Sequence, residues 1–445
     1  MAAIHHTSVS ARKVRQYSTI PNDHSKMPHY PKYLINTETQ CLERINDPPG
    51  PYAILSHTWG DDEIVMDDMR TKESRATSKR RKGYQKLSSA VHRAKSDGYG
   101  HIWIDTCCIN QASSAELSEA INAMHEYYAN SAVCYSYLED ISDAKDLDSA
   151  RWFSRGWTLQ ELVFSPHMQF YCGPDRNTFM GDKHSLLDVL ASRTGISPSV
   201  LTRKMRLDQL SIAHRMSWLA DRQTSRPEDM AYCMLGIFDV SMTPIYGEGD
   251  KAFHRLQECL LKEHDDQSLL AWTGPPSRWG VLADHPGVFA RACTSFLQNL
   301  ADNWTRAHLR AVSDGHGRLR ATMICWQAEP HPDRWQRWYA ILNHFCCQEG
   351  NKDRLHVIAL TQIQRRRLMF VREDTQTHFC SPYSLMTLMS RVAFEEGTHH
   401  TSTSHSWLTW ANVLKTLQGA FSTRAHGSKE ASAPQPRIDR SLIPL

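Results

Sequence analysis

The chain has 445 residues, a formal net charge of +3 and 41% hydrophobic residues, enough for two or three domains with a substantial core. This net charge is too small to attract nucleic acid or an anionic membrane to the protein as a whole. No apolar run is long enough to span a bilayer. The 12 cysteines include no CxxC pair, and the histidines show no metal-ligand spacing. We therefore expect reduced thiols, no bound metal and no disulfide framework.

The two ends of the chain are polar and lack apolar periodicity. We predict that residues 1–27 form a disordered leader and that residues 396–445 are a largely disordered tail. The leader is basic and almost free of acids, which is also typical of a mitochondrial targeting segment. We favour a dispensable extension of a cytoplasmic protein, with mitochondrial targeting as the alternative.

Strand and helix signals alternate over residues 28–200. Short apolar runs predict strands, and apolar residues at helical spacing predict helices between them. Such alternation predicts an α/β fold with a parallel sheet and helices on both of its faces. The predicted strands cover 52–57, 101–105, 132–138 and 168–171, and the helices between them cover 87–98, 113–128 and 152–162.

A helical extension is predicted at residues 201–270. Ser225 and Glu228 have the spacing of a capping box, with Pro227 in the first turn. This pattern predicts a helix that runs through Met234.

Two further features follow this predicted helix. The YGEG sequence at 246–249 lacks the full phosphate-binding pattern, so we predict a tight turn. Over residues 271–395 the pattern changes to apolar runs separated by polar turns, which indicates a β-rich C-terminal domain.

Polar and aromatic residues follow three of the predicted strands. In an open parallel sheet, ligands bind at the carboxyl ends of the strands, so these side chains would share one rim. Acids, amides and indoles together suit a ligand with ring faces and sugar hydroxyls. The predicted binding residues are Ser56, His57 and Trp59 after the first strand, Asp105, Asn110 and Gln111 after the second, and Arg155, Trp157 and Glu161 after the third.

The segment WFSRGWTLQEL, residues 152–162, places Glu161 four residues after Trp157, so both would lie on one face of a helix. A carboxylate beside an aromatic wall loses solvation and can become reactive. The alternative is a buried helix end in which Arg155 neutralises Glu161. Asp105 likewise has an alternative role, which is to cap the amides of its own turn.

Four segments resemble successive motifs of the fungal HET (heterokaryon incompatibility) domain: YAILSHTWGDDE, IWIDTCCINQ, SSAELSEAINAMHEYYANSAVCYSYL and RWFSRGWTLQEL. The later block RPEDMAYCMLGIFDVSMTPIYGEGDKAFHRLQE is similar to the segment that usually follows. The resemblance covers about residues 33–272, and we assign 28–200 to the HET domain itself. It implies that the protein recognises non-self on cell fusion and triggers programmed cell death.

The HET domain is similar to TIR domains, which implies a flavodoxin-like sheet, and some TIR domains cleave NAD. Their W-C-x-x-E motif carries the catalytic glutamate, and Trp157 to Glu161 keeps this spacing with Thr158 in place of the cysteine. The resemblance implies that Glu161 stabilises the oxocarbenium-like state when the nicotinamide–ribose bond breaks, with NAD as substrate and no cofactor. Trp59 or Trp157 would stack on a ring, and Ser56, Asp105 or Asn110 would hold ribose hydroxyls.

The rival hypothesis is a non-catalytic signalling module that acts by self-association. The acidic loop Asp61–Glu63 would then dock on a neighbouring copy, because short polar loops of this kind are expected to be exposed. Under either hypothesis the non-self partner is another protein, and neither nucleic acid nor a membrane span is involved.

Overall fold

The computed structural model describes residues 29–46, 48–173, 176–264, 266–275, 277 and 282–290, together with the backbone of strands β8 to β14 between residues 311 and 380. The predictions for residues 1–27 and 396–445 lie outside the described residues. Within the described part, no helix is both long enough and apolar enough to cross a membrane.

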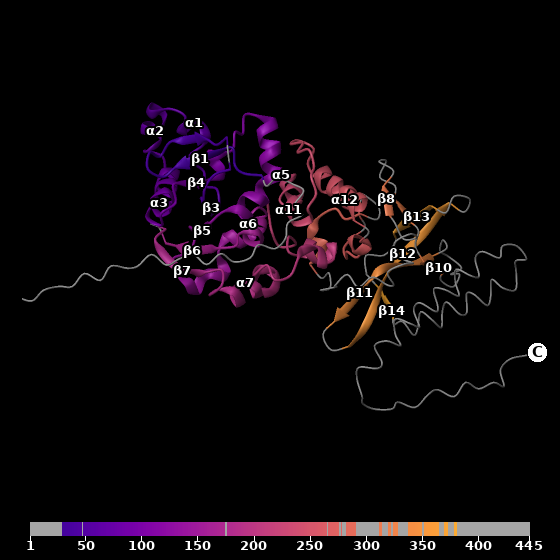
Figure 1. Cartoon of the computed structure of the whole chain (residues 1–445). Coiled ribbons are helices and arrows are strands. Elements are labelled where there is room, and N and C mark those ends of the chain that lie inside the picture. The colour runs from indigo at the N-terminus through magenta and orange to yellow at the C-terminus, as the bar shows by residue number, and fades with distance from the viewer. Residues whose placement is uncertain are drawn as a thin grey trace, which may run out of the picture.

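A seven-stranded sheet forms the first part of the fold (Figure 1), with the strand order β2-β1-β4-β3-β5-β6-β7. The four central strands, β4, β3, β5 and β6, are parallel, whereas β1, β2 and β7 pair antiparallel at the two edges. The central strands are the four that the sequence predicts, so the α/β class is confirmed. The strands are β1 Tyr33–Asn36, β2 Leu42–Arg44, β3 Ala53–His57, β4 His101–Trp103, β5 Val133–Leu138, β6 Met168–Cys172 and β7 Thr178–Asp182.

Several helices begin where the sequence pattern predicts them, but the continuous helix predicted at 152–162 is wrong, because the 3₁₀ turn η2 ends at Ser154 and α6 begins only at Thr158. Helix α3 buries Leu87, Ala90, Val91 and Ala94 at helical spacing, and the hydroxyl of Ser113 accepts the amide of Glu116 at the start of α5. The elements are α1 Met66–Met69, α2 Lys72–Ser78, α3 Gly83–Ser96, α4 Asp105–Cys108, α5 Ser114–Asn130, η1 Ala144–Ser149, η2 Arg151–Ser154, α6 Thr158–Phe164, α7 Leu187–Thr194 and α8 Pro198–Leu201.

The helical extension continues the same core, because one cluster of buried residues runs from Leu34 to Phe289. The sheet and the extension therefore fold against each other. The elements here are η3 Leu207–Gln209, α9 Ile212–Ser217, α10 Asp229–Tyr232, α11 Leu235–Phe238, α12 Lys251–Glu263, η4 Gln267–Leu270 and η5 Pro286–Phe289.

The predicted helix from the Ser225 capping box through Met234 is wrong. Helix α10 begins at Asp229, with Glu228 as its N-cap, and ends at Tyr232. The Glu228 carboxylate instead accepts the amides of the two glycines in the YGEG segment at 246–249, at 2.7 and 2.9 Å. This segment is a turn, as predicted, and both glycines have positive φ.

Seven further strands occupy the later part of the chain. Strands β10 to β13 pair antiparallel in chain order, β14 also pairs with β12, and β8 pairs with β9. They fall within the range that the sequence predicts to be rich in strands. Their bounds are β8 Ala311–Ser313, β9 Leu319–Ala321, β10 Ile324–Gln327, β11 Arg337–Gln348, β12 Asn351–Gln364, β13 Met369–Arg372 and β14 His378–Cys380.

Candidate functional site at the carboxyl edge of the sheet

The predicted rim residues divide between the two faces of the sheet. Ser56 and His57 are neighbours on β3, and successive side chains of a strand point to opposite faces. Ser56 contacts α6, whereas His57 faces α3 and α4. We call the two groups the Glu161 cluster, made of Ser56, Tyr128, Trp152 and Glu161, and the His57 cluster, made of His57, Trp59, Glu63, Lys86 and Asp105.

In the Glu161 cluster the carboxyl group is enclosed, and Glu161 is only 3% exposed. Ser56 hydrogen-bonds to the carboxyl group, and the indole of Trp152 donates to the Ser56 hydroxyl at 2.8 Å. Burial raises the pKa of Glu161 to about 8, although hydrogen bonds from Ser56 and Tyr128 oppose this rise. Glu161 is therefore mostly protonated at neutral pH.

Arg155 and Trp157 have partners in the helical extension. The guanidinium of Arg155 donates to the hydroxyl of Ser225 at 3.0 Å, and the indole of Trp157 hydrogen-bonds to Asp229 at the start of α10. Among the described residues Glu161 has no ion pair. Burial thus favours the protonated form of Glu161, Arg155 is hydrogen-bonded to the extension instead, and the indole within the Glu161 cluster is that of Trp152.

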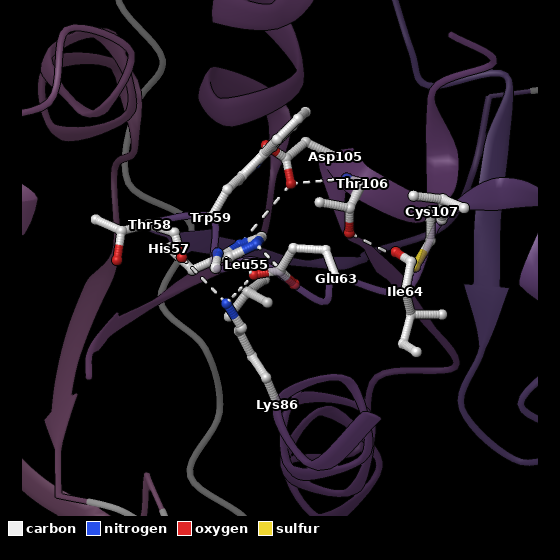
Figure 2. A network of polar contacts seen from close by, with 12 residues as sticks. Leu55, His57, Thr58, Trp59, Glu63, Ile64, Lys86, Asp105, Thr106 and Cys107 are labelled. Carbon is white, nitrogen blue, oxygen red and sulfur yellow. Dashed lines mark hydrogen bonds and ion pairs between the residues drawn. The ribbon is translucent and has the colours of Figure 1, made fainter. Parts of the chain in front are cut away.

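The His57 cluster lies on the other face of β3 (Figure 2). The ring nitrogens of His57 lie 3.8 Å from carboxylate oxygens of Asp105 and Glu63, which is too long for hydrogen bonds. Burial lowers the pKa of His57 well below its usual range, and the nearby cation of Lys86 lowers it further. His57 is therefore neutral, and its contacts with the two carboxylates are not charge pairs.

Lys86 joins this cluster from α3 and was not among the predicted site residues. Its side chain is 4% exposed, and its ammonium group lies 2.5 Å from Glu63 and 3.4 Å from Glu139. It also donates to the carbonyl of Thr58 at 3.1 Å. The signal in the sequence is its spacing, because Lys86 precedes Ala90 by four residues and so belongs to the apolar face of its helix.

Trp59 and Asp105 connect the His57 cluster to solvent. Trp59 is 45% exposed, and its indole donates to Asp105 at 2.7 Å. Asp105 also accepts the amide of Thr106, the next residue of its own turn, at 2.8 Å. Burial raises the pKa of Asp105 to about 6. The hydrogen bond to Asp105 therefore fixes the orientation of the exposed Trp59 ring.

The remaining predicted residues lie apart from both clusters. The side chain of Asn110 accepts the amide of Ala112, and Gln111 is exposed. Within the described part of the chain, no group of three or more His, Cys, Asp or Glu side chains is placed to hold a metal ion. A cavity of about 280 Å³ lies elsewhere, and its lining contains no predicted site residue: Thr273, Gly274, Gly287, Val288 and Ala290.

Residues 52–148 match the model of a protein family described as heterokaryon incompatibility protein (HET). This segment of the chain is similar to a HET domain. The family predicted from the sequence motifs is thereby confirmed, and the whole His57 cluster lies inside the matched range, whereas Glu161 follows it.

Over an alignment of 237 residues, which covers 51% of this chain, the sequence is 42% identical to the vegetative incompatibility protein HET-E-1 of Podospora anserina. This alignment spans 17% of the length of that relative. No solved structure matches the chain significantly.

Proposed function

We propose that the chain is a vegetative incompatibility protein whose HET domain triggers programmed cell death when non-self is recognised. The observation that carries this proposal is the 42% identity to a relative named for vegetative incompatibility, together with the HET family match. Since the aligned part is a small fraction of that relative, the proposal concerns what this module does rather than the activity of the whole relative.

The mechanism we propose is TIR-like cleavage of NAD at the nicotinamide–ribose bond. Two observations support it. The parallel strands lie in the order second, first, third, fourth along the chain, which agrees with a flavodoxin-like sheet. Glu161 keeps the W-x-x-x-E spacing and lies beside the carboxyl end of the sheet.

Chemistry at Glu161 requires a change from the arrangement described above. An ionised carboxylate must face the ribose to stabilise an oxocarbenium-like state. In this conformation Glu161 is covered and mostly protonated. The Glu161 cluster must therefore open and lose its proton before it can act, and the enclosed form is the resting state of the proposed enzyme.

Glu161→Gln is expected to abolish NAD depletion and cell killing while leaving the protein folded. The neutral amide resembles the protonated carboxyl group in size and hydrogen bonding, but it cannot ionise. Losing one such electrostatic group typically lowers kcat by about 10²–10³. Cell viability and NAD are measured together, with Glu119→Gln on the exposed face of α5 as the control. A folded Glu161→Gln variant that depletes NAD at the normal rate would refute the mechanism.

The second candidate is a non-catalytic signalling module that acts by self-association. An exposed apolar rim favours it, because Trp59 and Val65 are both partly exposed on either side of the acidic loop. The predicted exposure of the acidic loop is only partly confirmed, because Asp61 is exposed whereas Asp62 and Glu63 are half-buried. Asp62 accepts one hydrogen bond from Arg81 and one from the amide of Lys82, and Glu63 is paired with Lys86, so among the described residues Asp61 is the carboxylate of the loop without an ion pair.

Asp61→Lys is therefore the charge reversal that tests this candidate. It is expected to abolish self-association and cell killing without changing NAD, because it leaves the ion pairs of Asp62 and Glu63 intact. Light scattering on the purified protein reports the assembly state, with Asp61→Asn as a milder variant. If killing persists after self-association is lost, assembly is not the signal.

A further inference from the structure

The helical extension is hydrogen-bonded to the segment that leads into α6. The amide of Gln223 donates to the carbonyl of Ser154 at 2.7 Å, and the amide of Gly156 donates to the carbonyl of Gln223 at 2.9 Å. Arg155 and Gln223 thus form a parallel bridge. The chain immediately before the helix of Glu161 is paired on its backbone with a part of the extension.

This pairing brings the two backbones unusually close at Gly156. A Cβ atom at this position would lie 2.6 Å from a methyl carbon of Thr224 and 3.1 Å from the sulfur of Cys233. A residue with a side chain would push the extension away. Glycine is therefore required here for the extension to reach α6.

Arg222 adds a buried cation to the same contact. It is 4% exposed, and its guanidinium donates to the carbonyl of Arg155 at 2.8 Å and to the hydroxyl of Thr158 at 3.0 Å. A third bond goes to the carbonyl of Trp218 at 3.1 Å. No carboxylate pairs with this guanidinium among the described residues. Burying a cation raises the free energy of the folded state unless its N–H groups are hydrogen-bonded. The three acceptors must therefore stay in place around Arg222.

Thr158 transmits this contact to the Glu161 cluster. It is the first residue of α6, and its hydroxyl donates to the carbonyl of Trp152 at 2.6 Å while it accepts from Arg222. The indole of Trp152 in turn donates to Ser56, which hydrogen-bonds to Glu161. Thr158 stands where the W-C-x-x-E motif has cysteine, so this departure from the motif supplies the oxygen that Arg222 binds.

We propose that Arg222 is a positioning residue that fixes the first turn of α6 through Thr158 and thereby holds Glu161 in its enclosed place. This inference rests on the proposed function of Glu161. It also makes the extension part of the site, because a domain cut after residue 200 would lack Arg222. The far end of α6 is held independently, since the ammonium group of Lys183 donates to the carbonyls of Leu162 and Ser165.

The chain offers a matched control in Arg215. It is also 4% exposed and lies in the extension, where it donates to the carbonyl of Ile237 at 3.1 Å and lies over the ring of Phe238. None of these contacts involves α6 or the segment before it. Arg215→Met should therefore destabilise the protein to a similar degree without loosening the helix of Glu161.

The test compares Arg222→Met, Arg222→Lys and Arg215→Met in the full chain by amide hydrogen exchange of residues 158–164. Arg222→Met is expected to speed exchange there by about tenfold or more over Arg215→Met, the factor for one lost hydrogen bond to a charged group. Exchange in Arg222→Lys should be intermediate, because lysine keeps the positive charge but lacks the several N–H donors that the planar guanidinium presents. Equal exchange in the two methionine variants would overturn the proposal.

NAD turnover gives a second readout, and it separates this inference from the proposed function. We expect Arg222→Met to raise kcat relative to Arg215→Met at equal folded fraction, because it loosens the enclosed resting form of Glu161, with Arg222→Lys intermediate. If wild type and Glu161→Gln consume NAD equally, the proposed function fails, while hydrogen exchange still decides the role of Arg222. Should Arg222→Met not fold, Arg222→Lys decides alone, because wild-type exchange and turnover in that variant would refute the role.

Discussion

Glu161→Gln is expected to become increasingly stabilising, relative to wild type, as the pH is raised from about 5 to 8. The folded carboxyl group has a pKa of about 8, whereas the ordinary pKa of an exposed glutamate is 4.5. In this window the folded state binds more protons than the unfolded state, so wild type loses stability as the pH rises. The slope is on the order of 1.4 kcal/mol per pH unit, and glutamine, which cannot ionise, lacks it.

Urea unfolding of both proteins at several pH values measures this difference. Other groups with shifted pKa values, such as His57 and Lys183, are present in both proteins, so their contributions cancel when wild type is subtracted from the variant. Asp105, by contrast, interacts electrostatically with Glu161 and adds to the effect of burial in raising the pKa of that carboxyl group. Glu119→Gln, on an exposed side chain, should show a nearly flat difference. A constant difference for Glu161→Gln would mean that the folded carboxylate is already ionised at pH 5, and the enclosed resting state would then be wrong.

The central strands could be predicted from the sequence because their residues are continuously apolar. Every residue of β3 and of β5 is buried, and such runs are the signature of a parallel sheet covered on both faces. The edge strands gave no such signal. β2 has only three residues, none of them buried, and β7 has one buried residue of five. Short, half-exposed edge strands cannot be told from loops by periodicity.

The candidate site was predicted as one rim and is two clusters, and the reason is the alternation of side chains on β3. Ser56 and His57 cannot both face the same helix layer, because they are neighbours on one strand. Which tryptophan lies beside Glu161 depends on a break in the helix that the sequence does not reveal. The 3₁₀ turn η2 lies before Gly156 and α6, and Trp152 within this turn is the residue that is buried against Ser56. The spacing rule for a continuous helix selected Trp157 instead.

Lys86→Met is expected to destabilise the protein by about 3–5 kcal/mol, the cost of removing one partner from a buried ion pair. The side chain of Lys86 is 4% exposed, and those of Glu63 and Glu139 are 11% and 20% exposed. Without the ammonium group, Glu63 would be left with an uncompensated negative charge, 3.8 Å from a neutral imidazole that cannot replace the cation. Methionine fills much of the space of the lysine stem, so loss of charge rather than loss of volume would dominate.

A double substitution separates the charge from the packing. Lys86→Met combined with Glu63→Gln should recover a large part of the lost stability, because the unpaired carboxylate is removed together with its partner. Lys32→Met is the matched control, because the Lys32–Glu119 pair has exposed side chains and should contribute at most about 1 kcal/mol. Chemical unfolding of Lys86→Met, Glu63→Gln, the double variant and Lys32→Met at constant pH, each compared with wild type, measures the coupling. If Lys86→Met lowers the free energy of unfolding no more than Lys32→Met does, then water screens the charges of the His57 cluster. The burial that lowers the pKa of His57 would then be contradicted.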